Sequence, residues 1–118
     1  MAFILLVEDE KLIRWGFRRA LEARGHVVDE AATLEAADAH LRGHRPDILI
    51  LDVRLPDGNG LDVMMEQKAE LAESLVIVIT ASGAVETAVR AMKAGAADFL
   101  SKPLSEAEML AAVDQAVE

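Results

Sequence analysis

Short apolar runs alternate with longer amphipathic stretches, and this alternation limits the possible folds more than any other feature of the sequence. The apolar runs cover residues 3–7, 26–29, 47–51, 75–79 and 97–100, and the amphipathic stretches cover residues 10–24, 33–43, 59–71, 84–94 and 105–117. Strands that alternate with helices in this way predict βαβ units and a parallel sheet. We therefore expect an α/β protein with a flavodoxin-like, doubly wound sheet of five parallel strands, in the order 2-1-3-4-5, and five helices.

Local signals mark where the helices are expected to begin and end. Gly25 and Gly95 follow the first and fourth amphipathic stretches, where glycine commonly ends a helix. Thr33, Asp57 and Ser105 are placed to cap the N termini of the helices that follow them, and the spacing after Ser105 is that of a capping box. Four methionines at helical positions are expected to fill the core: Met64, Met65, Met92 and Met109.

Length and charge narrow the class of protein. The 118 residues form a single domain, long enough for a core of its own. No apolar run approaches the roughly 20 residues that span a bilayer. The absence of cysteine excludes disulfides and thiolate metal sites and fits a cytoplasmic location. A net charge of −9 argues against direct binding to nucleic acid, which needs a basic surface.

Polar side chains follow four of the apolar runs, at the points where strands are expected to end. Glu8 and Asp9 follow the first run, Asp52 the third, Thr80 the fourth, and Lys102 lies just past the fifth. In a parallel sheet the carboxyl ends of the strands open onto one crevice, where ligands bind. Three acids, a hydroxyl and an amine around one point suit a divalent cation and a phosphoryl group.

The acidic residues are candidate ligands for Mg²⁺. If ionised together in a crevice they would repel one another, and a hard dication would relieve that repulsion. Magnesium typically takes one or two carboxylates and keeps several waters. We expect Asp9 and Asp52 as direct ligands, the backbone carbonyl of Arg54 as a third, and Glu8 acting through water.

The remaining groups favour phosphoryl transfer to Asp52. Its carboxylate can attack phosphorus in line while Lys102 and Thr80 contact the phosphoryl oxygens. Each feature alone has a simpler interpretation: acidic pairs after strands are often solvated, a strand-end threonine is usually only a strand residue, and Lys-Pro is usually a turn. Their joint occurrence at four strand ends favours a site.

Four segments of the chain resemble the successive signatures of response-regulator receiver domains. They are Leu6–Glu10, Asp47–Gly60, Ile79–Ala81 and Gly95–Pro103. The resemblance extends from residue 4 to about 117, and the four segments together are highly specific. It implies a signalling domain that is not an enzyme in the usual sense, because it catalyses only its own phosphorylation and dephosphorylation.

The resemblance assigns roles to the candidate residues. It implies that a sensor histidine kinase phosphorylates Asp52, that Mg²⁺ is bound by Glu8, Asp9 and Asp52, and that Lys102 is the phosphate partner. One departure concerns Glu8, because the family more often has aspartate there, and we expect this difference to adjust metal affinity.

The resemblance also implies a switch. Thr80 and Phe99 would be the switch pair, and Arg54 and Ser82 would flank the approach of water and tune dephosphorylation. Movement of Phe99 would alter the face formed by the fourth helix, fifth strand and fifth helix, and so promote homodimerisation on phosphorylation. We expect that face to carry these residues: Val85, Val89, Met92, Lys93, Glu108 and Ala112.

Two finer segments, Leu12–Trp15 and Glu86–Gly95, resemble receivers of NtrC-like activators of the alternative, nitrogen-type sigma factor. Such receivers usually precede an ATPase domain and a DNA-binding helix-turn-helix. Neither output domain is within residues 1–118, which we expect to be an excised receiver. The kinase is expected to dock near the first helix and Pro103. Trp15 lies off the core-facing stripe of that helix and would join the docking patch, or else shield its own helix.

Two other classes of protein share some of these features. A phosphohydrolase with an aspartate nucleophile needs a second aspartate two residues after the first, where this chain has Arg54. A pseudo-receiver, a constitutive interaction module without the chemistry, would be expected to lack part of the constellation, which is complete here.

Overall fold

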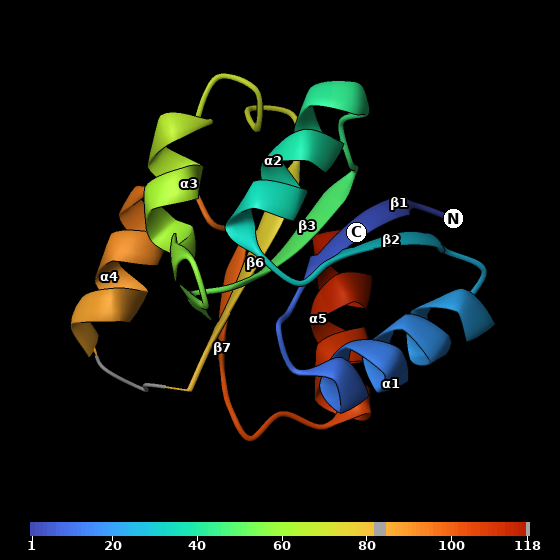
Figure 1. Ribbon diagram of the computed structural model, residues 1–118. Helices are drawn as coiled ribbons and strands as arrows, with labels where there is room; N and C mark the ends of the chain where they lie inside the picture. Colours follow the sequence, from blue (N-terminus) through green and yellow to red (C-terminus); the bar gives the residue numbers. More distant parts are fainter. Residues whose placement is uncertain (82–84, 118) are drawn as a thin grey trace.

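The computed structural model describes residues 1–81 and 85–117. In chain order its elements are β1 (Phe3–Val7), α1 (Lys11–Ala23), β2 (Val27–Ala31), α2 (Leu34–Gly43), β3 (Ile48–Asp52), β4 (Arg54–Leu55), β5 (Gly58–Asn59), α3 (Gly60–Glu66), β6 (Leu75–Thr80), α4 (Val85–Lys93), β7 (Asp98–Ser101) and α5 (Glu106–Ala116). Figure 1 shows the helices arranged around a central sheet.

Five parallel strands form that sheet, in the order β2-β1-β3-β6-β7. Because β6 and β7 are the fourth and fifth strands of the sheet along the chain, this is the predicted order 2-1-3-4-5. The central strands β1, β3 and β6 are apolar and almost entirely buried, as expected of strands covered on both faces. The register pairs Val7 with Leu51, Asp52 with Ile79, and Thr80 with Ser101, so the strands end close to one another at one edge.

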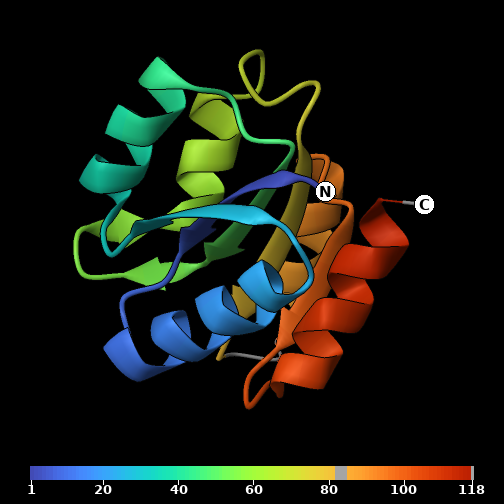
Figure 2. The same cartoon turned by 90° about the vertical axis from the view of Figure 1, so that its right-hand side faces the viewer.

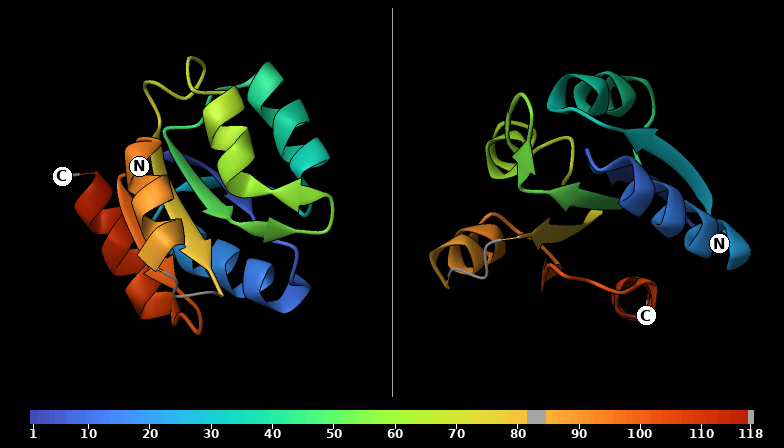
Figure 3. Two further views of the ribbon diagram at one scale, coloured as in Figure 1. Left: turned by 90° about the vertical axis from the view of Figure 1, so that its left-hand side faces the viewer. Right: turned by 60° about the horizontal axis from the view of Figure 1, so that its bottom comes forward.

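The helices cover both faces of the sheet and create two cores. Helices α1 and α5 lie on one face (Figure 2), and α2, α3 and α4 lie on the other (Figure 3). Phe17 and Leu21 of α1 pack with Met109 and Val113 of α5 over one face. Ala37, Leu61, Met64 and Ala91 contribute to the core on the opposite face. None of the helices within the described residues is both long and apolar enough to cross a membrane.

Most of the predicted helix ends are confirmed. Gly25 and Gly95 have φ values of +86° and +103°, in the left-handed region that favours glycine. The Thr33 side chain accepts a hydrogen bond from the N–H of Ala36, and Ser105 forms the complete capping box.

The prediction for Asp57 is wrong. Asn59 caps α3, accepting from the N–H of Leu61 at 2.8 Å. The carboxylate of Asp57 instead accepts hydrogen bonds from the N–H groups of Leu34 and Glu35, at 2.8 and 3.0 Å, and so caps α2. These bonds hold the pKa of Asp57 below its usual value. The reason is the two-stranded hairpin β4–β5, which the sequence analysis missed and which extends toward the start of α2 (Figure 3, left).

Three other expectations need correction. Helix α3 ends at Glu66 and not at residue 71, since the chain continues in turns. Met64 and Met109 are buried as predicted, but Met65 and Met92 are 61% and 50% exposed, because they lie on the outer sides of their helices. Ala112, expected on the exposed face of α5, is buried.

The edge strand β2 is fastened to α1 by a cluster of charges. The carboxylate of Glu30 accepts from Nε of Arg14 at 2.9 Å and also from the guanidinium of Arg18. Burial tends to raise the pKa of Glu30, but the hydrogen bonds from Arg18 and Arg14 outweigh it and place the pKa below its usual value. This pairing favours the folded state at pH values above the pKa that Glu30 has in the unfolded chain, and the benefit disappears as the pH falls through the lowered pKa.

We therefore expect Glu30→Gln to lower the free energy of unfolding by up to about 1 kcal/mol near pH 7 and by much less near pH 3. Urea denaturation at a series of pH values measures this difference. Glu73→Gln is the control, because Glu73 forms a single, highly exposed ion pair with Arg45. An equal loss at both ends of the pH range for Glu30→Gln would contradict the prediction.

Candidate functional site at the carboxyl ends of the strands

Four of the predicted site residues lie at the carboxyl ends of four neighbouring strands. Glu8 directly follows β1, Asp52 ends β3, Thr80 ends β6, and Lys102 directly follows β7. The side chains of Glu8 and Asp52 are almost fully buried, and Thr80 is 1% exposed. Parallel pairing brings these strand ends together, so the arrangement follows from the sheet topology.

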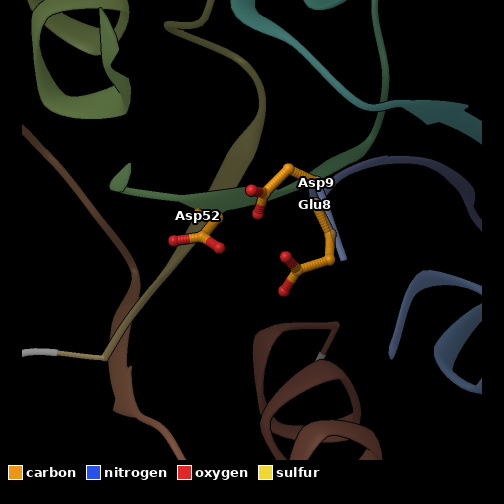
Figure 4. Close-up of side chains that lie close together, drawn as sticks. All are labelled: Glu8, Asp9 and Asp52. Carbon is orange, nitrogen blue, oxygen red and sulfur yellow. The ribbon is translucent and has the colours of Figure 1, made fainter. Parts of the chain in front are cut away.

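The three predicted acidic residues form one cluster. One carboxylate oxygen from each of Glu8, Asp9 and Asp52 lies within 4.8 Å of the others. Figure 4 shows Glu8 and Asp9, from consecutive positions, beside Asp52 of the neighbouring strand. No other set of three potential metal ligands lies this close together within residues 1–81 and 85–117.

Lys102 is shared between two of these carboxylates. Its Nζ lies 2.8 Å from Oδ2 of Asp52 and 2.8 Å from Oε1 of Glu8. Burial opposes the charge on Lys102, but its hydrogen bonds to Asp52 and Glu8 raise its pKa above the usual value. Burial raises the pKa of Glu8 to about 7, with the negative charge of Asp52 acting in the same direction and the hydrogen bonds from Lys102 and Glu10 opposing it. The single ammonium of Lys102 therefore does not neutralise the negative charge of this acidic cluster.

The main chain fixes the position of Asp52. Its Oδ1 accepts from the N–H of Arg54 at 3.1 Å, and the next residue, Val53, donates to the carbonyl of Ile79 at 2.9 Å. The carbonyl of Val53 accepts from the N–H of Gly60 at 2.7 Å. A Cβ at Gly60 would lie only 2.5 Å from the carbonyl oxygen of Asp52, so the chain passes closely behind this residue.

This donor set fits Mg²⁺. The cluster offers carboxylate oxygens, which hard dications prefer, and its negative charge is only partly balanced by Lys102. Asp9 is exposed, which leaves its carboxylate accessible from solvent.

Two other predicted residues, Arg54 and Phe99, lie in the described part of the chain. The side chain of Arg54 is exposed at the start of β4. Phe99 pairs with Val78 in the sheet and is half-buried against the core under α2, α3 and α4. Ser82 lies outside the described residues.

Arg14 is a contact that the sequence analysis missed. Its Nη1 donates to the carbonyl of Glu8 at 2.7 Å and approaches that of Asp9 at 3.5 Å, while its Nε binds Glu30. The only signal in the sequence is an arginine one turn into the helix that follows an acidic pair, which is a weak pattern on its own.

Residues 4–114 match the family model of the response regulator receiver domain. The chain belongs to this family. Receiver domains are signalling domains of two-component response regulators, they bind Mg²⁺ at an acidic pocket, and they act with histidine kinases. The predicted resemblance is thus confirmed at the level of the family.

The receiver is similar to parts of known transcriptional regulators. It is 43% identical over 113 residues to the alginate biosynthesis transcriptional regulatory protein AlgB of Pseudomonas aeruginosa, covering 95% of this chain and 25% of AlgB. It is 40% identical over 100 residues to the photosynthetic apparatus regulatory protein RegA of Rhodobacter capsulatus, covering 85% of this chain and 54% of RegA. The chain thus spans between a quarter and about half of these relatives.

Solved receiver structures have the same fold. The non-phosphorylated HemR receiver domain from Leptospira biflexa gives a TM-score of 0.94 at 30% identity, covering 100% of this chain and 95% of that one. The beryllofluoride-activated NtrC4 receiver domain dimer gives a TM-score of 0.90 at 38% identity, covering 97% of this chain and 94% of that one. The second structure is a dimer, so receivers can dimerise.

Proposed function

We propose that this receiver accepts a phosphoryl group on Asp52 from a sensor histidine kinase, with Mg²⁺ bound, and passes the signal on through dimerisation. The observation that carries the proposal is the position of the Asp52 carboxylate, which lies at a strand end beside the ammonium of Lys102 and close to the acidic pair Glu8 and Asp9.

Each residue of the site has a separate role in the proposed phosphoryl transfer. Glu8, Asp9, Asp52 and the backbone carbonyl of Arg54 would hold Mg²⁺, which when bound supplies positive charge for the incoming phosphoryl oxygens. An oxygen of Asp52 attacks phosphorus, and the bond from phosphorus to the kinase histidine breaks. Lys102 exchanges its contact with Asp52 for one with a phosphoryl oxygen.

A labelling time course tests this function against the two other classes of protein. With Mg²⁺ and a small-molecule phosphodonor, the receiver should gain the mass of one phosphoryl group and then lose it slowly. A hydrolase would consume the donor continuously, and a pseudo-receiver would gain no mass. Either result would contradict the proposal. We propose that Arg54 and Ser82 tune the rate at which the label is lost.

The proposed kinase-docking surface lies on α1 and the segment that follows β7. Trp15 and Leu12 are 57% and 81% exposed on α1. A cavity of about 150 Å³ is lined by Phe17 of α1 and by Lys102, Pro103 and Leu104. Exposed apolar groups on α1, together with a cavity that reaches Lys102, support a partner that approaches from this side.

We expect Trp15→Ala to slow phosphotransfer from the cognate kinase several-fold while leaving labelling by a small phosphodonor unchanged. The reason is that Trp15 is exposed, with only the Arg19 guanidinium stacked over its ring at 4.8 Å. Initial rates with each donor measure the difference. Arg45→Ala, which changes an exposed residue far along the chain between α2 and β3, is the control. Equal slowing with both donors would indicate a folding role for Trp15.

The proposed output surface lies on α4, β7 and α5. Val85, Val89 and Met92 form an exposed apolar row on α4, with exposed fractions of 76%, 44% and 50%. Arg90 and Lys93 on the same helix and acidic residues of α5 give the face charges of both signs, which suits pairing of two copies about a twofold axis. Phosphorylation would draw the Thr80 side chain toward the phosphoryl group, and Phe99 would move into the space that Thr80 leaves. This change would be a shift in population between two existing states of the domain.

We expect beryllofluoride (a phosphoryl mimic) with Mg²⁺ to convert a mainly monomeric receiver into a dimer, and Val89→Glu to prevent this. Sedimentation velocity with and without the mimic measures the change. Val27→Glu is the matched control, because Val27 is 52% exposed on the edge strand β2, away from the proposed face. Dimerisation that survives Val89→Glu, or no dimerisation of the wild type, would contradict the proposed output surface.

For the full-length protein we propose an NtrC-like architecture. The segments Leu12–Trp15 and Glu86–Gly95 and the likeness to the NtrC4 receiver support an output that comprises an ATPase domain for the alternative sigma factor and a DNA-binding domain. In that setting the receiver dimer would release or assemble the ATPase.

A further inference from the structure

We infer that Arg14 is a positioning residue, which holds the main chain of Glu8 and Asp9 so that their carboxylates face Asp52. This inference rests on the proposed Mg²⁺ site. It extends that site to a residue of α1 that supplies no ligand to the metal.

The first observation is that, on the side of α1, the side chain of Arg14 contacts the main chain of the acidic loop. Glu10 is the N-cap of α1, but its side chain makes no capping hydrogen bond. The Arg14 Nη1 instead donates to the Glu8 carbonyl at 2.7 Å and lies 3.5 Å from the Asp9 carbonyl. The guanidinium therefore contacts the main chain of both acidic residues without binding their carboxylates.

The second observation is that Arg14 is itself held in place. Its Nε donates to Oε1 of Glu30 at 2.9 Å, and its side chain is only 17% exposed. Glu30 is followed by Ala31, whose carbonyl accepts from the N–H of Glu8 at 3.0 Å. The end of β2 thus fixes the acidic loop twice, once through the main chain and once through the Glu30–Arg14 pair. The planar, forked guanidinium makes the two contacts through separate nitrogens, Nε and Nη1, whereas a lysine at this position would have to make both from one nitrogen.

Arg18 provides a matched control. It binds the same carboxylate of Glu30, but its other ion pair is with Glu22 and it contacts neither loop carbonyl. Removing either arginine takes one positive charge from the same side of the domain. The loss of this positive charge alone would leave the affinity for Mg²⁺ unchanged or increase it, because the surroundings of the site would become more negative. Loss of positioning would decrease the affinity, so the two explanations predict opposite signs.

The test compares Arg14→Ala, Arg14→Lys and Arg18→Ala by calorimetric titration with Mg²⁺. We expect both Arg14 variants to bind Mg²⁺ about tenfold more weakly than the wild type, as is typical when a group that orients a metal ligand is removed, and Arg18→Ala to stay within about twofold of the wild type. The lysine variant keeps the charge, so weakening there excludes a purely electrostatic cause. Equal or tighter binding by the Arg14 variants would overturn the inference, as would equal weakening in Arg18→Ala.

Amide exchange in the metal-free protein separates this inference from the metal site itself. We expect faster exchange at residues 8–10 in Arg14→Lys than in the wild type and no change there in Arg18→Ala. If the wild type bound no Mg²⁺, the proposed site would fail while the exchange result would still test the role of Arg14. Unchanged exchange at residues 8–10 would overturn the role of Arg14 even with an intact metal site.

Discussion

Asp52→Asn should abolish phosphoryl labelling, so that no mass gain is detected in the time that fully labels the wild type. A neutral amide is a poor nucleophile and a weaker ligand for a dication than a carboxylate. The fold should tolerate the change, because the amide oxygen can still accept from the N–H of Arg54 and the strand remains fully buried and paired. Intact-protein mass spectrometry with a small phosphodonor and Mg²⁺ measures the effect.

Asp57→Asn is the control for that experiment. Asp57 lies five residues beyond Asp52, in the turn of the β4–β5 hairpin, but its carboxylate faces the start of α2, where it accepts from Leu34 and Glu35. An asparagine there keeps one acceptor, so labelling should proceed as in the wild type. Labelling of Asp52→Asn at the wild-type rate would show that another residue is the acceptor.

Gly60→Ala should be the most destabilising of the small substitutions near the site. The added Cβ would lie 2.5 Å from the carbonyl oxygen of Asp52 and 3.0 Å from the side chain of Leu51. Because one of these contacts is main chain, relief requires a shift of β3 against the start of α3. Overpacking of this kind commonly costs 1–3 kcal/mol, and we expect about 2 kcal/mol or more here.

Urea denaturation followed by circular dichroism measures this loss, and Gly43→Ala is its control. Gly43 ends α2 and no atom lies within 4 Å of the position that its Cβ would take. Alanine at Gly43 should leave stability unchanged or raise it by about 0.5 kcal/mol, because alanine restricts the unfolded chain. We also expect Gly60→Ala to slow labelling, since the shift moves Asp52. A Gly60→Ala variant as stable as Gly43→Ala would contradict the close approach.

The sheet could be predicted because its signal lies in continuous segments. The runs that became β1, β3 and β6 consist of β-branched and aliphatic residues without polar alternation, as required of strands covered on both faces. Parallel topology then placed Glu8, Asp52 and Lys102 together without further information, because it brings the strand ends to one edge.

The features that could not be predicted from the sequence depend on contacts between segments that are distant in the chain. Asp57 has the residue type and the position of a local helix cap, and only the hairpin that carries it shows that it caps a different helix. Arg14 resembles any solvated arginine of α1 until its two loop carbonyls and Glu30 are in place. Met65 and Met64 are adjacent in α3, yet only Met64 faces the sheet, since helix phase and not residue type decides burial.

The capping of α2 by Asp57 has a consequence for the order in which this chain is completed during synthesis. Thr33 supplies a local cap, through the N–H of Ala36, but the amides of Leu34 and Glu35 bind a residue that follows them by 23 and 22 positions. A nascent chain that ends before Asp57 therefore lacks both partners, although all of α2 is present. The start of α2 can reach its final form only after the segment that contains Asp52 has also been made, which ties the maturation of this helix to that of the segment with the proposed phosphoacceptor.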